Sequence, residues 1–208
     1  MKSTEQEKKY FINPYTNLKD IRKYGSLIIE KGRGIYVYDE NNNKYIEGLA
    51  GLWCVALGFN NKRLIKAANK QLNLLPNYHS FTGKVPLTTL KLSEELVKIS
   101  PKSLTKVLYA NSGSESNDTA IKMAWYYQNA LGRTKKKKII SRYRGYHGVT
   151  IMSGSLTGMD YAHKGFDMPR DFVLHTDSPH YYKDALNQES SNRFVNRLLK
   201  NLEDLIFK

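Results

Sequence analysis

The sequence has little cysteine and no long apolar run. A single cysteine, Cys54, occurs among 208 residues, so no disulfide can form within the chain, which is typical of a reducing compartment. Residues 1–17 contain no apolar signal-peptide core, and no stretch of 18 apolar residues predicts a membrane span. The sequence therefore predicts a cytoplasmic protein without a membrane partner, in which Cys54 is a small buried residue.

Several common ligand-binding motifs are also missing. Neither the phosphate-loop pattern GxxxxGK[ST] nor the dinucleotide pattern GxGxxG occurs. His175 and His180 flank Asp177, but no third and fourth metal ligands follow. We interpret them as loop histidines and expect no metal site.

The charge balance favours basic residues. Lys and Arg number 33 against 19 Asp and Glu, which gives a net charge of +14 and makes an acidic partner worth considering. The basic residues are scattered, however, and the one dense run, Lys135–Lys138, is typical of a solvated connection between a helix and a strand. A nucleic-acid-binding module is an alternative interpretation, although we expect no nucleic-acid partner.

The first part of the chain predicts a hairpin followed by helices. Residues 35–38 and 44–46 have strand composition and are joined by a polar turn. Asn61 can cap a helix that ends before Pro76, and a second helix is predicted over 87–99.

From residue 106 the pattern becomes strand, loop, helix, strand, which is typical of a parallel sheet with covering helices. A strand is predicted over 106–110, a helix after the loop 111–116, and a further strand from Ile139. The last helix, from Phe194 almost to Lys208, has a continuous apolar face. A covering helix normally leads to another strand. None follows here, so we expect an incomplete chain.

Small polar residues stand where the predicted strand 106–110 meets the next helix. Ser112 and Ser114 bring hydroxyl groups, and Gly113 allows close approach to the backbone. The unpaired N–H groups of a helix start favour a phosphate dianion. From this segment alone, a capping role for Ser112 or Ser114 is the simpler interpretation.

Three motifs together resemble the class III aminotransferases, in the ω-transaminase branch of the pyridoxal-phosphate (PLP) enzymes. The run Asn111–Ala120 is similar to their phosphate-binding turn, and Gly145-Tyr146-His147-Gly148 to their aromatic motif. The segment Gly51-Leu52-Trp53-Cys54-Val55 is similar to their pocket segment. The resemblance covers the amino-terminal part of such an enzyme.

The resemblance implies an α/β protein of fold type I, with a mostly parallel sheet and covering helices. Residues 1–57 would be an N-terminal segment of the small domain, and residues 58–208 an incomplete large domain. The PLP phosphate would bind at Ser112, Gly113 and Ser114, and Tyr146 would stack on the ring. Trp53 would line the substrate pocket, which Phe81 could reach across a dimer interface.

The function implied by the resemblance is transfer of an amino group from an amine or ω-amino acid to a keto acid, with pyruvate favoured, in a homodimer. The family's catalytic lysine and the aspartate of the pyridine nitrogen would lie beyond Lys208, so we expect no catalytic residue within the chain and no activity from it alone. Alternatives are a non-catalytic truncated subunit, an aminomutase or a decarboxylating transaminase.

Overall fold

The computed structural model describes residues 3–207, which form two compact units that divide between Leu92 and Ser93. Each unit is considered by itself. The predicted domain boundary at 57/58 concerns the family's domains and stays a prediction. Residues 1, 2 and 208, at the ends of the two predicted domains, lie outside the described residues. Among residues 3–207, no helix combines the length and apolar character needed to cross a membrane.

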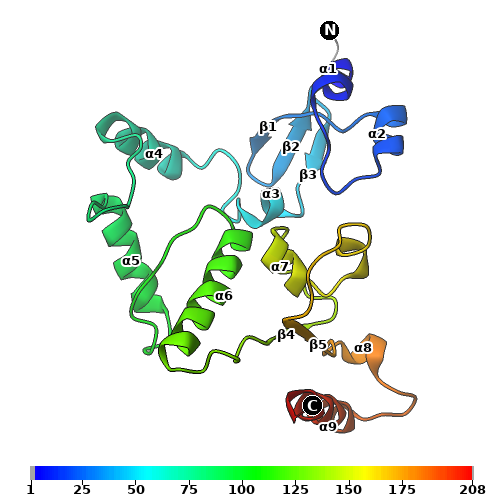
Figure 1. The fold of residues 1–208 in the computed structure, drawn as a ribbon. Helices are drawn as coiled ribbons and strands as arrows, with labels where there is room; N and C mark the ends of the chain where they lie inside the picture. The colour runs from blue at the N-terminus through cyan, green and yellow to red at the C-terminus, as the bar shows by residue number, and fades with distance from the viewer. Residues whose placement is uncertain (1–2, 208) are drawn as a thin grey trace. The chain divides into compact units, whose positions relative to one another are not determined.

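The first unit combines a small antiparallel sheet with short helices (Figure 1). Its elements are α1 (Ser3–Tyr10), α2 (Leu18–Tyr24), β1 (Ile29–Arg33), β2 (Tyr36–Asp39), β3 (Lys44–Ile46), α3 (Ala50–Trp53), α4 (Lys62–Leu74) and the start of α5 (Leu87–Ile99).

The predicted hairpin is confirmed as β2 and β3, with Val37 opposite Tyr45. The carboxylate of Asp39 fixes its turn by accepting hydrogen bonds from the backbone N–H groups of Asn41 and Asn43 at 2.9 and 2.8 Å. The sequence did not reveal β1, because its polar residues do not alternate with apolar ones.

Both predicted helices are confirmed. The side chain of Asn61 caps α4 by accepting from the backbone N–H groups of Arg63 and Leu64, and α5 spans Leu87–Ile99.

The second unit holds a parallel strand pair with helices packed against it. Its elements are α6 (Gly113–Ala130), β4 (Ile139–Arg142), α7 (Ile151–Leu156), the 3₁₀ turn η1 (Asp160–Ala162), β5 (Val173–Thr176), α8 (Tyr181–Asp184) and α9 (Ser191–Phe207). Figure 1 shows α7 and α9 on opposite sides of the two strands, in agreement with the contacts of α7 with both strands and of α9 with β5. The buried core is Ile121, Leu156 and Val173. The rings of Trp125 and Phe172 pack against this core and meet each other edge to face.

Some predictions for this unit are wrong. Residues 106–110 form no strand, because no other described strand lies beside them to complete a ladder. His175 is not a loop histidine but lies in β5, whereas His180 precedes α8 and its Nδ1 accepts from the backbone N–H of Lys183 at 3.1 Å.

The basic run does connect α6 to β4, but it is less free than the sequence indicates. The carbonyl of Lys137 accepts from Trp125 Nε1 at 3.0 Å, and the ammonium of Lys138 donates to the carbonyl of Asp171. Two of its four lysines therefore tie the connection to its surroundings.

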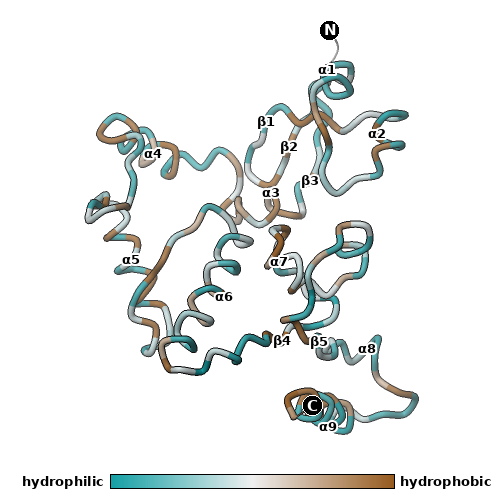
Figure 2. The backbone as a smooth tube through the Cα atoms, in the orientation of Figure 1, coloured by the Kyte–Doolittle hydropathy of each residue, from teal (hydrophilic) through white to brown (hydrophobic). Residues whose placement is uncertain are grey.

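The final helix α9 is strongly amphipathic, and Figure 2 shows both brown and teal parts in it. Phe194 is 2% exposed and meets Tyr181 edge to face, whereas Leu199 and Ile206 are 58% and 57% exposed. Its first turns therefore anchor the helix, and much of its apolar stripe remains uncovered by the described residues.

Candidate functional site

The start of α6 is organised by a reciprocal cap. Ser112 has an extended backbone, and its Oγ accepts from the backbone N–H of Glu115 at 3.2 Å. Glu115 reaches back to the backbone N–H of Asn111 at 2.7 Å. The capping role considered from the sequence is therefore real, and it shapes the turn that precedes Gly113 and Ser114.

The groups left over at this helix start suit a phosphate. The N–H groups of Gly113 and Ser114 belong to the first turn, where an α-helix offers no acceptor. Apart from its two chain neighbours and the backbone of its own helix, a Cβ placed on Gly113 would meet no heavy atom within 4 Å, so open space lies beside these donors. Ser112 and Ser114 each accept one hydrogen bond from a backbone N–H and keep their own hydroxyl hydrogens for a ligand. Because phosphate oxygens need such donors, the residues present fit a phosphate dianion.

Tyr146 lies in the loop that follows β4, and 52% of its side chain is exposed. The loop is shaped by backbone hydrogen bonds from Arg144 to Gly158 at 2.6 Å and from Gly158 to Gly145 at 2.8 Å. Beyond Tyr146, the backbone N–H of Val149 donates to Ser114 Oγ at 3.0 Å. The structure thus brings the helix start Ser112–Ser114 and the loop of Tyr146 together within the second unit.

His147, the next residue of this loop, is partly buried. Its Nε2 is buried and has no hydrogen-bond partner among the described residues. Burial lowers the pKa of the His147 ring, and the positive charge that His175 can carry lowers it further. We therefore assign His147 a packing role.

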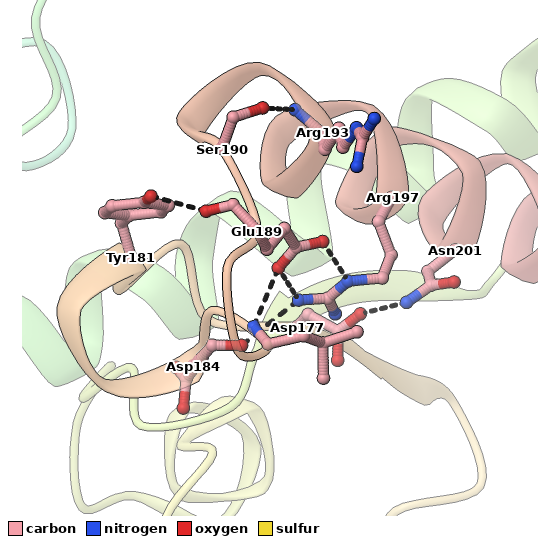
Figure 3. Close-up of polar contacts among 9 residues, drawn as sticks. Asp177, Tyr181, Asp184, Glu189, Ser190, Arg193, Arg197 and Asn201 are labelled. Carbon is pink, nitrogen blue, oxygen red and sulfur yellow. Dashed lines mark hydrogen bonds and ion pairs between the residues drawn. The ribbon is translucent and has the colours of Figure 1, made fainter.

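An ion pair also holds the loop. The Arg144 guanidinium makes two hydrogen bonds to the Asp184 carboxylate, at 2.6 and 2.7 Å. The Asp184 carbonyl accepts from Arg197 Nη2 at 3.1 Å, and Arg197 is paired with Glu189 at 2.8 and 2.9 Å. Figure 3 shows the Glu189 carboxylate facing the Arg197 guanidinium. Sequence reasoning missed this chain of contacts, because no local pattern links residues 144, 184 and 197.

Trp53 and Phe81 lie in the first unit, each 76% exposed, and no described contact joins them. Cys54 is also exposed, so the prediction that it is buried is wrong. The reason is the short element α3, whose backbone is left-handed. Ala50, Gly51, Leu52 and Trp53 all have φ between 49° and 66°, and this turn carries Trp53 and Cys54 at the surface.

A left-handed turn is costly for residues other than glycine, by about 1–2 kcal/mol each. Gly51 is the one glycine among the four. Sequence reasoning had no signal for this turn, because non-glycine residues seldom adopt such a backbone.

Comparison with known proteins identifies the family. The family model "Aminotransferase class-III" matches residues 20–207. A γ-aminobutyrate transaminase of Solanum lycopersicum is 54% identical over 183 residues, covering 88% of this chain and 36% of the relative. A vanillin aminotransferase of Capsicum chinense is 51% identical over 183 residues, covering 88% of this chain and 40% of the relative. The chain thus spans less than half the length of these curated relatives.

Solved structures agree with the sequence relatives. The ω-transaminase of Pseudomonas jessenii, solved in complex with PMP, has a TM-score of 0.96 and 49% identity over 100% of this chain and 46% of its own. An aminotransferase of Vibrio fluvialis in its PMP-bound form has a TM-score of 0.95 and 37% identity, covering 99% of this chain and 45% of its own. The predicted fold, a part of the fold type I architecture, is confirmed.

The predicted cytoplasmic location is contradicted by the same comparisons. The names of the tomato relative and of relatives from rice describe them as mitochondrial. The prediction relied on the single cysteine and on the absence of an apolar signal core, and neither feature distinguishes the cytoplasm from the mitochondrial matrix. The match over residues 20–207, the identity of about half with plant and bacterial transaminases and the shared fold lead to one conclusion: this chain belongs to the class III aminotransferases.

Proposed function

We propose that the second unit binds PLP, with its phosphate on Ser112, Gly113 and Ser114 and its ring against Tyr146. The observation that carries the proposal is the open space beside Gly113, at a helix start whose first-turn N–H groups and serine hydroxyls have hydrogens to donate. The loop of Tyr146 is hydrogen-bonded to this same helix start. Class III aminotransferases use PLP, and the Pseudomonas jessenii relative was solved with PMP.

Each residue of the site has a distinct task in this proposal. The backbone N–H groups of Gly113 and Ser114 bind the phosphate near the positive end of the α6 dipole. The hydroxyls of Ser112 and Ser114 donate to its remaining oxygens. The Tyr146 ring covers one face of the pyridine, fixes its tilt and excludes water there. Bound PLP supplies the electron sink of the chemistry.

For the whole protein we propose transfer of an amino group from an amine or ω-amino acid to a keto acid, with pyruvate as the acceptor. The names of the tomato and pepper relatives support an amino-transfer reaction. Trp53 and Phe81 are proposed to line the substrate pocket, since both aromatic side chains are largely exposed in the first unit. The domain assignment at 57/58 and a homodimeric assembly complete the proposal.

A cofactor titration tests the site. The purified chain is titrated with PLP, and binding is followed by the quenching of tryptophan fluorescence, with inorganic phosphate as competitor. We expect saturable binding that phosphate weakens, and at least a tenfold weaker affinity in Gly113→Ala, whose Cβ would enter the open space. The melting temperature of that variant should be unchanged or slightly higher, so a weaker affinity would not reflect a damaged fold. PLP binding that ignores both phosphate and Gly113→Ala would reject the assignment.

A further inference from the structure

Two side chains in the second turn of α6 join the phosphate-binding helix to the loop of Tyr146. The amide of Asn117 donates to the carbonyl of His147 at 2.6 Å. Asp118 Oδ1 accepts from Thr150 Oγ1 at 2.7 Å and from the backbone N–H of Ser153 at 2.9 Å. We call the side chains of Asn117 and Asp118 the latch. Its contacts connect segments about 30 residues apart in the sequence.

The latch acts on backbone groups of the loop and of helix α7. Thr150 is the N-cap of α7, but its side chain makes no capping hydrogen bond, and Asp118 instead accepts from the first turn of that helix. This carboxylate therefore serves as a cap from a distant element. Ser153 is fully buried, so water cannot easily replace Asp118 as its acceptor.

Neighbouring side chains restrict the loop at Gly148 and His147. A Cβ on Gly148 would approach Ser114 Oγ to 2.6 Å and would overlap Ser153 Oγ. The buried Thr157 hydroxyl accepts from the backbone N–H of His147 at 3.0 Å and donates to the carbonyl of Gly148 at 3.2 Å. Residues 147–150, directly after Tyr146, are thus held from two sides.

We propose that Asn117 and Asp118 are positioning residues that set the place of the Tyr146 ring relative to the phosphate site. Neither is proposed to touch the cofactor. They act through the backbone of 147–153, which they hold to the same helix that begins at Ser112–Ser114. This inference rests on the proposed function, because it assumes that one ligand contacts both the helix start and Tyr146.

A positioning role and a purely structural role predict different ligand affinities. PLP needs the phosphate site and the ring face together, whereas glycerol phosphate needs the phosphate site alone. If the latch positions the ring face, Asp118→Ala should weaken PLP binding about tenfold, as expected for loss of hydrogen bonds to a charged group. Its affinity for glycerol phosphate should stay within twofold of the wild type. Equal losses for both ligands would overturn the proposal.

A double-mutant cycle gives a second readout. Tyr146→Ala should weaken PLP binding by itself. Adding Asp118→Ala should then cause little further loss, because the ring that the latch would position has already been removed. Fully additive losses would contradict the proposal. Asn117→Ala should behave like Asp118→Ala, while Asp118→Asn, which keeps an oxygen acceptor for Ser153, should retain most of the PLP affinity.

Controls separate this inference from the proposed function. Asp204→Ala removes a carboxylate whose side chain is 63% exposed on α9, and it should change neither affinity. Amide hydrogen exchange of residues 145–153 is compared between the wild type and Asp118→Ala without any ligand. Faster exchange in the variant supports the latch even if PLP does not bind, in which case only the proposed function fails. Unchanged exchange would reject the latch.

Discussion

Asp184 receives two hydrogen bonds from the guanidinium of Arg144, at 2.6 and 2.7 Å, although the two residues are 40 positions apart. Arg144 lies two residues before Tyr146, in a left-handed backbone conformation with φ of 64°. The hydrogen bonds from Arg144 lower the pKa of the Asp184 carboxyl. Within the second unit, this bidentate pair secures the β4 end of the Tyr146 loop, opposite the end held by the latch.

Replacing Arg144 by lysine should lower the melting temperature by a few degrees. A lysine keeps the positive charge but cannot form the two parallel hydrogen bonds of a guanidinium. Scanning calorimetry measures the shift. Arg193→Lys is the matched control, because the Arg193 side chain has no described ion pair. Equal melting temperatures for the Arg144 variant and the control would contradict the prediction.

Gly148→Ala should lower the free energy of unfolding by about 2–4 kcal/mol. Gly148 has a φ of 138°, and the added Cβ would overlap the hydroxyls of Ser114 and Ser153. Gly113→Ala, in open space on a right-handed helix, should instead be neutral or stabilising by up to about 1 kcal/mol. Urea unfolding followed by tryptophan fluorescence measures both variants, because Trp125 packs against the core of the second unit.

Leu52→Gly should raise the free energy of unfolding by about 0.5–1 kcal/mol, because glycine relieves the left-handed strain at φ of 60°. Little burial is lost, since Leu52 is 65% exposed. Leu72→Gly, at a residue that is 55% exposed in the right-handed helix α4, should lower the free energy of unfolding by about 1 kcal/mol. Denaturant unfolding of the two variants should therefore give opposite signs, and a loss in both would indicate that the turn is unstrained.

The pair Glu189–Arg197 should stabilise the protein in a defined pH range. Hydrogen bonds from Arg197, together with the backbone N–H of Leu186, lower the pKa of Glu189 from 4.5 to about 2. A depressed carboxyl pKa adds stability above the unfolded value, and this contribution is lost as the pH falls from about 4.5 through about 2.

Arg197→Met should therefore be less stable than the wild type at pH 7, and the difference should shrink across that range. Thermal unfolding at a series of pH values is the measurement. A difference that stays constant down to pH 2 would show that the pair contributes through packing alone. Lys200→Met, which removes an exposed i,i+4 partner of Asp204, is the control.

His147 should make the fold sensitive to mild acid. Burial and the neighbouring His175 lower the pKa of His147 from 6.5, so the unfolded chain takes up a proton at a higher pH than the folded chain. Stability should consequently fall as the pH drops below about 6.5.

In His147→Gln the part of the stability loss that comes from protonation of His147 should disappear, whatever the variant's stability at pH 7. Melting temperatures between pH 7 and 5 measure it, and His79→Gln controls for losing an exposed histidine. An unchanged slope in His147→Gln would assign the acid sensitivity to other groups.

Local signals determined much of the fold. Asn61 before a periodic apolar stripe predicted α4, and the alternation around a polar turn predicted β2 and β3. The small polar residues 112–114 predicted a capped helix start, which α6 has at Ser112, because a helix cap acts within one turn of the chain. The family followed from three short motifs, which the matches over residues 20–207 confirm.

Other features depended on contacts between distant segments. Residues 106–110 have strand composition, yet a strand also requires hydrogen bonds to a neighbouring strand. The composition of the segment does not show whether such a neighbour lies beside it. Cys54 has the character of a buried residue, but the left-handed turn before it leaves it exposed. Composition likewise could not distinguish one reducing compartment from another.

The sequence by itself determined the family, and it predicted which residues would bind a phosphate, because both depend on residue type within a few positions. Only the tertiary structure decided how the loop of Tyr146 is held against the start of α6. Asp118 meets Ser153, and Arg144 meets Asp184, through hydrogen bonds that cross 35 and 40 positions. Such bonds depend on where helices and strands pack, and packing is a property of the whole unit rather than of any segment.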